Sequence, residues 1–204
     1  MLNEVVEAIT HERYVKLFLL GDESALKSIW RDGNNRAYLE RIVQDKQFED
    51  IARVVASEIL YKEKPDYPPS EYDDALAYVY SQALRMTGNN DVLVSKLMGN
   101  QWGFLYHDDE LGDAGREILG RHLMATGNKS IPYLIPLLDD TNLILYEGSQ
   151  EATLGNSFGY RVKDAAAYYI AKLLGIDIRF YQQIEDRDKE IKKLKSKLRE
   201  VGYE

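Results

Sequence analysis

The chain has 204 residues, of which 45% are hydrophobic and 29% charged, a composition that is normal for one folded, soluble domain. It contains no cysteine, which excludes a disulfide framework and a thiolate zinc site. Its formal net charge of −8 argues against a broad nucleic-acid surface, because phosphate binding depends on clustered Lys and Arg.

The N-terminal segment has the pattern of a helix and not of a targeting signal. It lacks a basic start followed by an apolar run, and no stretch approaches the roughly 20 apolar residues of a membrane span. We therefore expect a cytoplasmic protein. Apolar residues at helical spacing predict a helix over 2–20 and another over 22–30, separated by Gly21. The residues expected to face the core are Leu2, Val5, Val6, Ile9, Leu17, Phe18, Leu26, Ile29 and Trp30.

Residues 36–61 predict a helical hairpin with a short corner at Asp45. The linker KEKPDYPP follows, since its three prolines disfavour helix in the residues before them. Ser70 is then expected to cap a further helix. The apolar stripes comprise Leu39, Ile42 and Val43, then Phe48, Ile51, Ala52, Val55 and Ile59, then Leu76, Val79, Tyr80 and Ala83.

Two helix ends share the letters Thr-Gly-Asn, at 87–89 and 126–128. The two glycines, Gly88 and Gly127, stand where glycine commonly stops a helix, and each motif leads into a further apolar segment. Their offset, 127 − 88 = 39, is close to the period of about 40 residues of helical-repeat arrays. The match indicates stacked helical units.

Residues 131–175 form the clearest unit, with two helical stripes on either side of a long corner. The stripes are Ile131, Leu134, Ile135 and Leu138, then Val162, Ala166, Tyr169, Ile170 and Leu173. About fifteen residues more than a short corner needs lie between them. This insertion, 141–159, contains helix-breaking glycines, and residues 143–146 have the pattern of a short strand, so we expect a hairpin or an ordered loop.

The unit 131–175 resembles a HEAT repeat. Pro132 and Pro136 lie in its first helix, Asp139-Asp140 marks its corner, and Arg161-Val162-Lys163 opens a second helix that continues into an alanine run. The long corner departs from the family pattern. The resemblance implies an all-α fold, an irregular HEAT-like superhelix of about four or five helical pairs in a single domain over 1–204.

The last predicted helix, 177–201, is strongly charged and carries a thin apolar stripe. From Glu185 to Glu204 there are seven Lys or Arg and six Asp or Glu. Because the stripe spans fewer than three heptads and Arg187 or Asp188 interrupts it, we favour a capping helix over a short coiled coil. The stripe residues are Ile184, Ile191, Leu194, Leu198 and Val201.

The loop 99–113 is the first candidate binding segment, because it is both aromatic and acidic. His107 and its three acidic neighbours are the densest set of potential metal ligands, but adjacent loop side chains point in different directions, so we predict no metal and no cofactor. A solvated acidic loop and a patch for a basic partner both remain open. The candidate residues are Trp102, Phe104, Tyr106, Asp108, Asp109 and Glu110.

The insertion is the second candidate, because it mixes aromatic and polar groups near a repeat corner, where repeat proteins often bind. The candidates are Tyr146, Glu147, Gln150, Glu151 and Tyr160. For Arg161 and Asp164 we favour a structural role, the polar ladder between repeats. The 15 tyrosines suit either an interface or half-buried positions in stacked helices.

No catalytic triad, P-loop or dinucleotide fingerprint is present, and the single His11-Glu12 pair falls short of a di-iron hydroxylase. We therefore predict a non-enzymatic module that binds a basic protein. A small, acidic, cysteine-free repeat protein is similar, at the level of class, to the bacterial immunity proteins that cover a toxin's active site. A scaffold or adaptor is the alternative within binding. A lyase or a DNA glycosylase on a HEAT-like frame is the alternative of another class, for which the basic face 192–199 is the only support.

Overall fold

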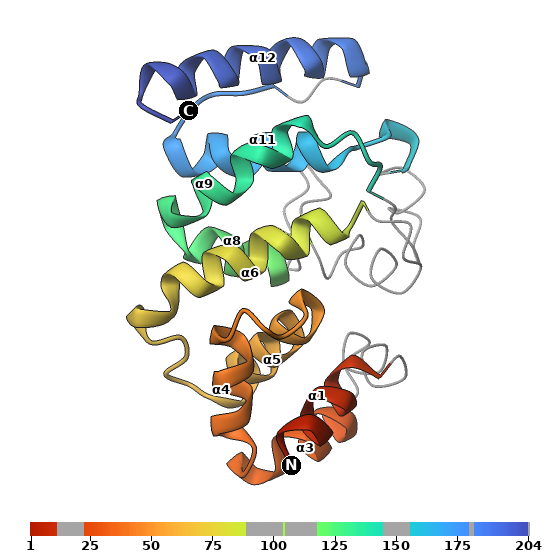
Figure 1. Ribbon diagram of the computed structural model, residues 1–204. Coiled ribbons are helices and arrows are strands. Elements are labelled where there is room, and N and C mark those ends of the chain that lie inside the picture. Colours follow the sequence, from red (N-terminus) through yellow and green to blue (C-terminus); the bar gives the residue numbers. More distant parts are fainter. Residues whose placement is uncertain (12–22, 89–103, 105–117, 145–155, 180–181, 204) are drawn as a thin grey trace. The chain divides into compact units, whose positions relative to one another are not determined.

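The structure is a computed structural model that describes residues 1–11, 23–88, 104, 118–144, 156–179 and 182–203 (Figure 1). The elements in these ranges are helices, and the β interaction found among them is an isolated bridge between Leu143 and Arg161. The prediction of an all-α protein is therefore confirmed. Among the same residues, no helix has both the length and the apolar character that crossing a membrane requires.

The chain forms two compact units, Met1–Ala83 and Leu84–Glu204, and α6 runs across the boundary between them. The helices of the first unit are α1 (Leu2–Thr10), α3 (Glu23–Trp30), η1 (Arg31–Gly33), α4 (Arg36–Gln44), α5 (Asp50–Glu63), η2 (Ser70–Tyr72) and most of α6 (Asp73–Met86). Those of the second are α8 (Ile118–Ala125), η4 (Gly127–Ser130), α9 (Ile131–Leu134), η5 (Ile135–Asp139), α11 (Val162–Leu174) and α12 (Ile184–Glu200).

Helix α5 is the centre of the first unit, because α1, α3 and α4 all pack against it. Every residue from Ala52 to Leu60 is buried, and the predicted α4 stripe of Leu39, Ile42 and Val43 is fully buried opposite it. The predicted helical hairpin is thus present, with its short corner at Asp45, where α4 ends in extended backbone.

The polar groups that α5 buries have partners from neighbouring segments. The Ser57 hydroxyl hydrogen-bonds with the hydroxyls of Tyr67 (3.1 Å) and Tyr80 (2.8 Å), and the Tyr80 hydroxyl donates to Glu58 Oε1 at 2.6 Å. Burial raises the pKa of both tyrosines, which keeps them neutral hydrogen-bonding groups. This network fastens the linker 64–69 and α6 to α5.

Two predicted boundaries in the first unit are wrong. The helix that begins at Leu2 ends at Thr10, because His11 adopts extended backbone, so the prediction of one helix over 2–20 is too long. Ser70 opens a short 3-10 turn without a side-chain cap, and α6 begins at Asp73.

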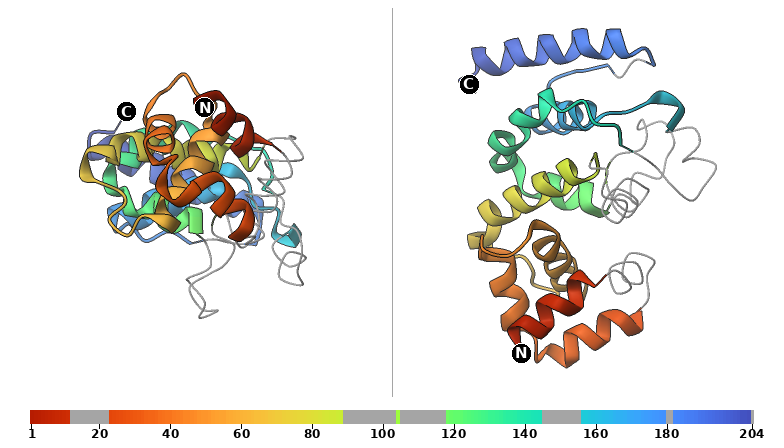
Figure 2. Two further views of the ribbon diagram at one scale, coloured as in Figure 1. Left: turned by 90° about the horizontal axis from the view of Figure 1, so that it is seen from below. Right: turned by 45° about the vertical axis from the view of Figure 1, so that its right-hand side comes forward.

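Helix α11 is the centre of the second unit, where α9, η5 and α12 pack against it (Figures 1 and 2). It ends at Gly175, whose left-handed φ of 63° lets the chain reverse while the Ile176 amide donates to the Ala171 carbonyl at 2.8 Å. Val162, Ala166, Tyr169 and Ile170 are buried as predicted.

The predicted helix 131–138 is two short pieces, α9 and η5, because Pro136 cannot donate an amide within a helix. The tighter 3-10 winding of η5 repeats every three residues, so Leu137 follows Leu134 into the core while Ile135 is half-exposed.

The two Thr-Gly-Asn motifs adopt similar helix ends. The Thr87 hydroxyl donates to the Leu84 carbonyl at 2.6 Å, and the Thr126 hydroxyl donates to the Leu123 carbonyl at 2.7 Å. Their glycines differ. Gly127 has a positive φ of 60°, and a Cβ added there would have no neighbouring atom within 4 Å. Gly88 is closely packed, because a Cβ added there would lie 2.5 Å from Val162 Cγ2.

Helix α12 begins at Ile184, seven residues later than predicted. Ile191, Leu194 and Leu198 of its stripe are buried, whereas Ile184 and Val201 at its ends are exposed. The prediction of a helix that covers the preceding one agrees with the packing of α12 on α11.

Candidate functional site

The base of the insertion is closed by backbone hydrogen bonds between its two limbs. The Lys163 amide donates to the Asp140 carbonyl (2.9 Å), the Val162 amide to the Asn142 carbonyl (2.9 Å), and the Ile144 amide to the Tyr160 carbonyl (2.8 Å). These bonds surround the antiparallel bridge from Leu143 to Arg161. The two limbs of the insertion, for which a hairpin or an ordered loop was predicted, are therefore paired at their base, while residues 145–155 lie outside the described part of the chain.

Arg161 and Asp164 form the first turn of α11 and pair with each other. The Asp164 carboxylate accepts from the Arg161 backbone amide at 2.9 Å and from its Nε and Nη2 at 3.0 and 2.8 Å. Asp164 thus caps the start of α11 in one direction, since its carboxylate accepts from both the backbone amide and the side chain of Arg161, and a guanidinium has no acceptor to offer in return. The Asp164 side chain is wholly buried, so its charge depends on these donors.

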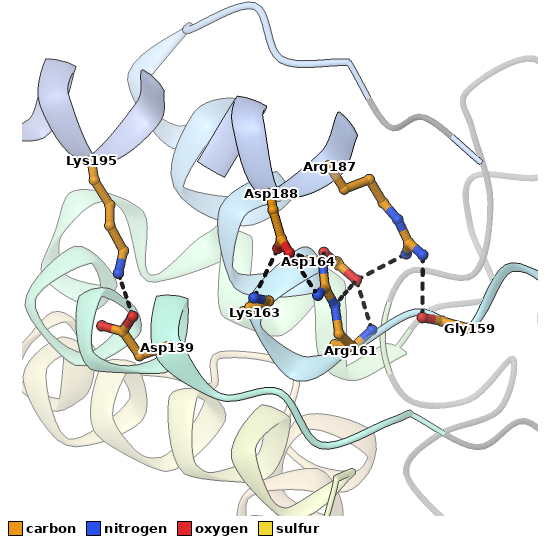
Figure 3. A network of polar contacts seen from close by, with 8 residues as sticks. All are labelled: Asp139, Gly159, Arg161, Lys163, Asp164, Arg187, Asp188 and Lys195. Carbon is orange, nitrogen blue, oxygen red and sulfur yellow. Dashed lines mark hydrogen bonds and ion pairs between the residues drawn. The ribbon is translucent and has the colours of Figure 1, made fainter. Parts of the chain in front are cut away.

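Helix α12 completes the network from the other side (Figure 3). Arg187 donates to Asp164 Oδ2 at 2.9 Å, and its Nη2 donates to the backbone carbonyls of Phe158 (2.6 Å) and Gly159 (3.3 Å). Asp188 accepts from Arg161 Nη2 and pairs with Lys163, both at 2.8 Å. The returning limb of the insertion is therefore fastened to both α11 and α12.

The network contains three cations, Arg161, Lys163 and Arg187, and two carboxylates. Hydrogen bonds from Arg161 and Lys163 lower the pKa of Asp188, which is only half-buried. Burial alone would lower the pKa of Arg161, but its hydrogen bonds to Asp164 and Asp188 outweigh burial and raise it. Both shifts favour the charged forms of Arg161 and Asp188, and the five side chains together form an arrangement that we call the ionic clamp.

The aromatic residues of the returning limb lie against this clamp. The rings of Phe158 and Tyr160 stack with centroids 5.7 Å apart, and the Arg187 guanidinium lies 5.0 Å from the Tyr160 centroid. A second, more exposed contact joins α12 to the corner, where Lys195 Nζ lies 2.5 Å from Asp139 Oδ1.

The structure places four of the predicted residues, Phe104, Tyr160, Arg161 and Asp164. Tyr160 is half-buried beside Arg187, and Arg161 and Asp164 pair as described above. The other predicted binding residues lie outside the described part of the chain: Trp102, Tyr106, Asp108, Asp109, Glu110, Tyr146, Glu147, Gln150 and Glu151. One further prediction is wrong. Phe104 is buried and packs edge-on against Tyr169, so it serves the core and is not available as an anchor for a partner.

Arg187 is the residue of this site that the sequence reasoning missed. Its charge interrupts the predicted apolar stripe, yet it stands four residues before Ile191 and seven before Leu194, on the same face. It is 1% exposed, and Ile191 and Leu194, which follow it in the sequence pattern, are buried at 5% and 2%. The signal was its register, which places a long charged side chain on the buried face and so requires a buried acidic partner.

Within the described ranges, no group of three or more His, Asp or Glu side chains is arranged to hold a metal ion. The predicted acidic set at 107–110 lies outside those ranges. The described geometry at the insertion therefore comprises a backbone-closed base, a buried ionic clamp and a half-buried aromatic pair.

Comparisons with protein-family models, with curated proteins and with solved structures give no match for this chain.

Proposed function

We propose that the chain is a non-enzymatic binding module of the HEAT-like helical-repeat class, and that its 141–159 insertion binds a basic protein partner. Two features of the insertion carry the proposal together: backbone hydrogen bonds hold its base, and all the charged side chains of residues 139–160 are acidic. Residues 139–160 contain four carboxylates, Asp139, Asp140, Glu147 and Glu151, and no Lys, Arg or His. A segment of this kind attracts a basic surface and repels an acidic one.

The clamp supports this proposal physically. A loop that becomes ordered upon binding loses conformational entropy, and this loss makes the free energy of binding less favourable. Here the two limbs are already joined by backbone hydrogen bonds, and Arg187 holds the carbonyls of Phe158 and Gly159. The binding segment would therefore start from an anchored position.

The repeat class is supported by the helix pairs α4–α5 and α9/η5–α11, and by the matching hydroxyl contacts of Thr87 and Thr126 at an offset of 39 residues. The number of repeats, four or five pairs, belongs to the proposal. Among repeat proteins, an inhibitor such as an immunity protein binds one partner tightly and one to one, whereas an adaptor presents two separable faces.

The test is affinity capture from lysate of the source cells with two baits: the wild-type chain, and a variant in which 147–154 is replaced by a short Gly-Ser turn. This replacement leaves 156–161 and their contacts with Arg187 in place. We expect basic proteins that the wild type retains and the variant loses. Equal capture by two baits of equal helical content would refute a role for the insertion.

A further inference from the structure

The second half of α12 concentrates positive charge on an acidic chain. Residues 192–199 contain no Asp or Glu, and their cations are Lys192, Lys193, Lys195, Lys197 and Arg199. By contrast, no nine consecutive residues within 1–179 contain more than two Lys or Arg. Four of the five cations are exposed and Lys195 is half-buried, so the basic face 192–199 is a local reversal of the chain's net charge of −8.

Most of this positive charge is not neutralised by the fold. Lys193 pairs with Glu190 at 2.6 Å, and Lys195 pairs with Asp139 at 2.5 Å (Figure 3). In the described part of the chain, the cations of the basic face that take part in no ion pair are Lys192, Lys197 and Arg199. Asp188, one helical turn before Lys192, pairs with α11 instead.

The stability of α12 does not account for the basic face. Lys193 and Lys197 are four residues apart, and like charges at this spacing repel each other on a helix. Cations stabilise the negative C-terminal end of a helix, but this effect falls off within the last turn. Lys192 and Lys193 lie seven or more residues before Glu200, where α12 ends. A binding role explains charges that the helix itself does not need.

The basic face is turned away from the core. The apolar residues Ile191, Leu194 and Leu198 are buried on the side of α12 that packs against α11. Lys192 and Arg199 are seven residues apart, which is about two helical turns, so they share one exposed side and are separated by about 10.5 Å along the helix axis. A short segment of a partner can therefore contact both.

The composition of α12 decides among the anionic partners that could bind there. Leu194 and Leu198 are each 2% exposed, so the helix offers no apolar face to a lipid surface. Residues 184–200 contain no aromatic side chain on which the bases of a single-stranded nucleic acid could stack.

Charge beyond the basic face also disfavours a long polyanion. The remaining residues have a net charge of −13 (−8 − 5), and they repel any polyanion that extends over them. Screening confines the attraction to roughly 8 Å at physiological salt, so a short acidic segment benefits from the basic face without meeting this repulsion. An acidic peptide segment is therefore the partner that the charge distribution favours.

We propose that the basic face 192–199 is a docking surface for a short acidic segment of a partner protein, whose carboxylates pair with Lys192, Lys197 and Arg199. This inference goes beyond the proposed function, because it does not depend on the insertion. A chain with an acidic and a basic docking surface has the two separable faces of an adaptor, whereas an inhibitor of a single basic partner needs the acidic one alone.

The probes are short peptides selected from a phage-displayed random library on the full wild-type chain and then synthesised with a fluorescent label. The selection is depleted on the basic-face variant, which combines Lys192→Gln, Lys197→Gln and Arg199→Gln. A matched control replaces three exposed cations elsewhere and gives the same net charge of −11 (−8 − 3), by Lys46→Gln, Lys62→Gln and Arg121→Gln. Melting curves followed by circular dichroism establish that both variants are folded.

The Kd of each peptide is measured by fluorescence anisotropy. We expect peptides rich in Asp and Glu, whose Kd rises by about tenfold in the basic-face variant, because three exposed charge contacts are lost together. The Kd should rise with salt, and it should stay within about twofold in the matched control and in the chain with 147–154 replaced. An equal Kd for the two variants, peptides without acidic residues, or no enriched peptide would overturn the inference.

Other occupants are tested with the same variants. A single-stranded DNA oligonucleotide or a phosphatidylserine vesicle that bound more tightly than the peptides, and lost binding in the basic-face variant, would assign the face to nucleic acid or membrane and overturn the inference. Self-association of the wild type in sedimentation experiments that the basic-face variant abolished would assign the face to a second copy and overturn it too. None of these results bears on binding by the insertion.

Discussion

The ionic clamp makes a specific prediction for Asp164→Asn. The Asp164 carboxylate is wholly buried and accepts four hydrogen bonds, three from Arg161 and one from Arg187. Asparagine has nearly the same shape, but it offers one acceptor oxygen, and its amide group would face guanidinium donors. The substitution therefore leaves two buried cations without their shared anion.

Removal of one member of a buried ion pair destabilises a protein by about 3–5 kcal/mol, because an uncompensated charge stays buried. For a chain of this size that loss corresponds to a fall in Tm of roughly 6–20 °C. The control is Asp188→Asn. Asp188 pairs with Arg161 and Lys163 but is 43% exposed, so its loss should reduce the free energy of unfolding by only about 1 kcal/mol or less.

The free energies of unfolding of the wild type and both variants are measured by urea titration, followed by circular dichroism at 222 nm. The clamp predicts that Asp164→Asn is destabilised by several times more than Asp188→Asn. Similar small losses for the two variants would show that Asp164 is not the buried centre of the network.

Gly88→Ala should lower the free energy of unfolding by about 1–3 kcal/mol, because the new Cβ would lie 2.5 Å from Val162 Cγ2 and 2.7 Å from Asn142 Cβ. Adding Val162→Ala to the same chain should restore part of that loss, as measured by urea titration. Tyr80→Phe should lower the free energy of unfolding by about 1–3 kcal/mol, because buried Glu58 loses the hydroxyl donor that lies 2.6 Å away. The control Tyr38→Phe, at a position outside this network, should leave the free energy of unfolding from urea titration nearly unchanged. The pKa of Asp188 is lower in the folded chain than its ordinary value of 3.8, so ionised Asp188 stabilises the fold fully above that value. This stabilisation is lost as pH falls through the lower, folded-state pKa. The Tm of Asp188→Asn should therefore depend less on pH below about 4 than the Tm of the wild type. Arg187→Met should increase the rate of hydrogen exchange at amides 156–160 more than in the α4–α5 hairpin, since the carbonyls of Phe158 and Gly159 lose their donor. Equal protection of amides 156–160 in the variant and the wild type would contradict the role of Arg187 in holding this limb.

Helical periodicity predicted the buried residues of regular helices well. Leu39, Ile42 and Val43 in α4 are fully buried, as is the Val162-to-Ile170 face of α11 apart from small residual exposure at Tyr169. In these helices the apolar side chains alone decide which face turns inward, and a single sequence contains that information.

The prediction failed where backbone chemistry or a distant partner decides the outcome. Pro136 turned one predicted helix into α9 and a 3-10 segment, which moved Leu137 into the core. The register of Arg187 places it on the buried face of α12, but its partner could not be predicted, because Asp164 lies 23 positions earlier and is brought to it only by the packing of α12 on α11. Phe104 occupies an acidic, glycine-punctuated stretch, yet contact with Tyr169 buries it.

Binding of a basic protein by the insertion can be tested through the Kd of a captured partner. The Kd is measured by isothermal titration calorimetry at two salt concentrations, for the wild type and for the chain with 147–154 replaced. We predict that the wild-type Kd rises with salt and that the replacement raises it by about a hundredfold or more, with helical content unchanged. A Kd that is independent of both salt and the insertion would contradict the proposed function.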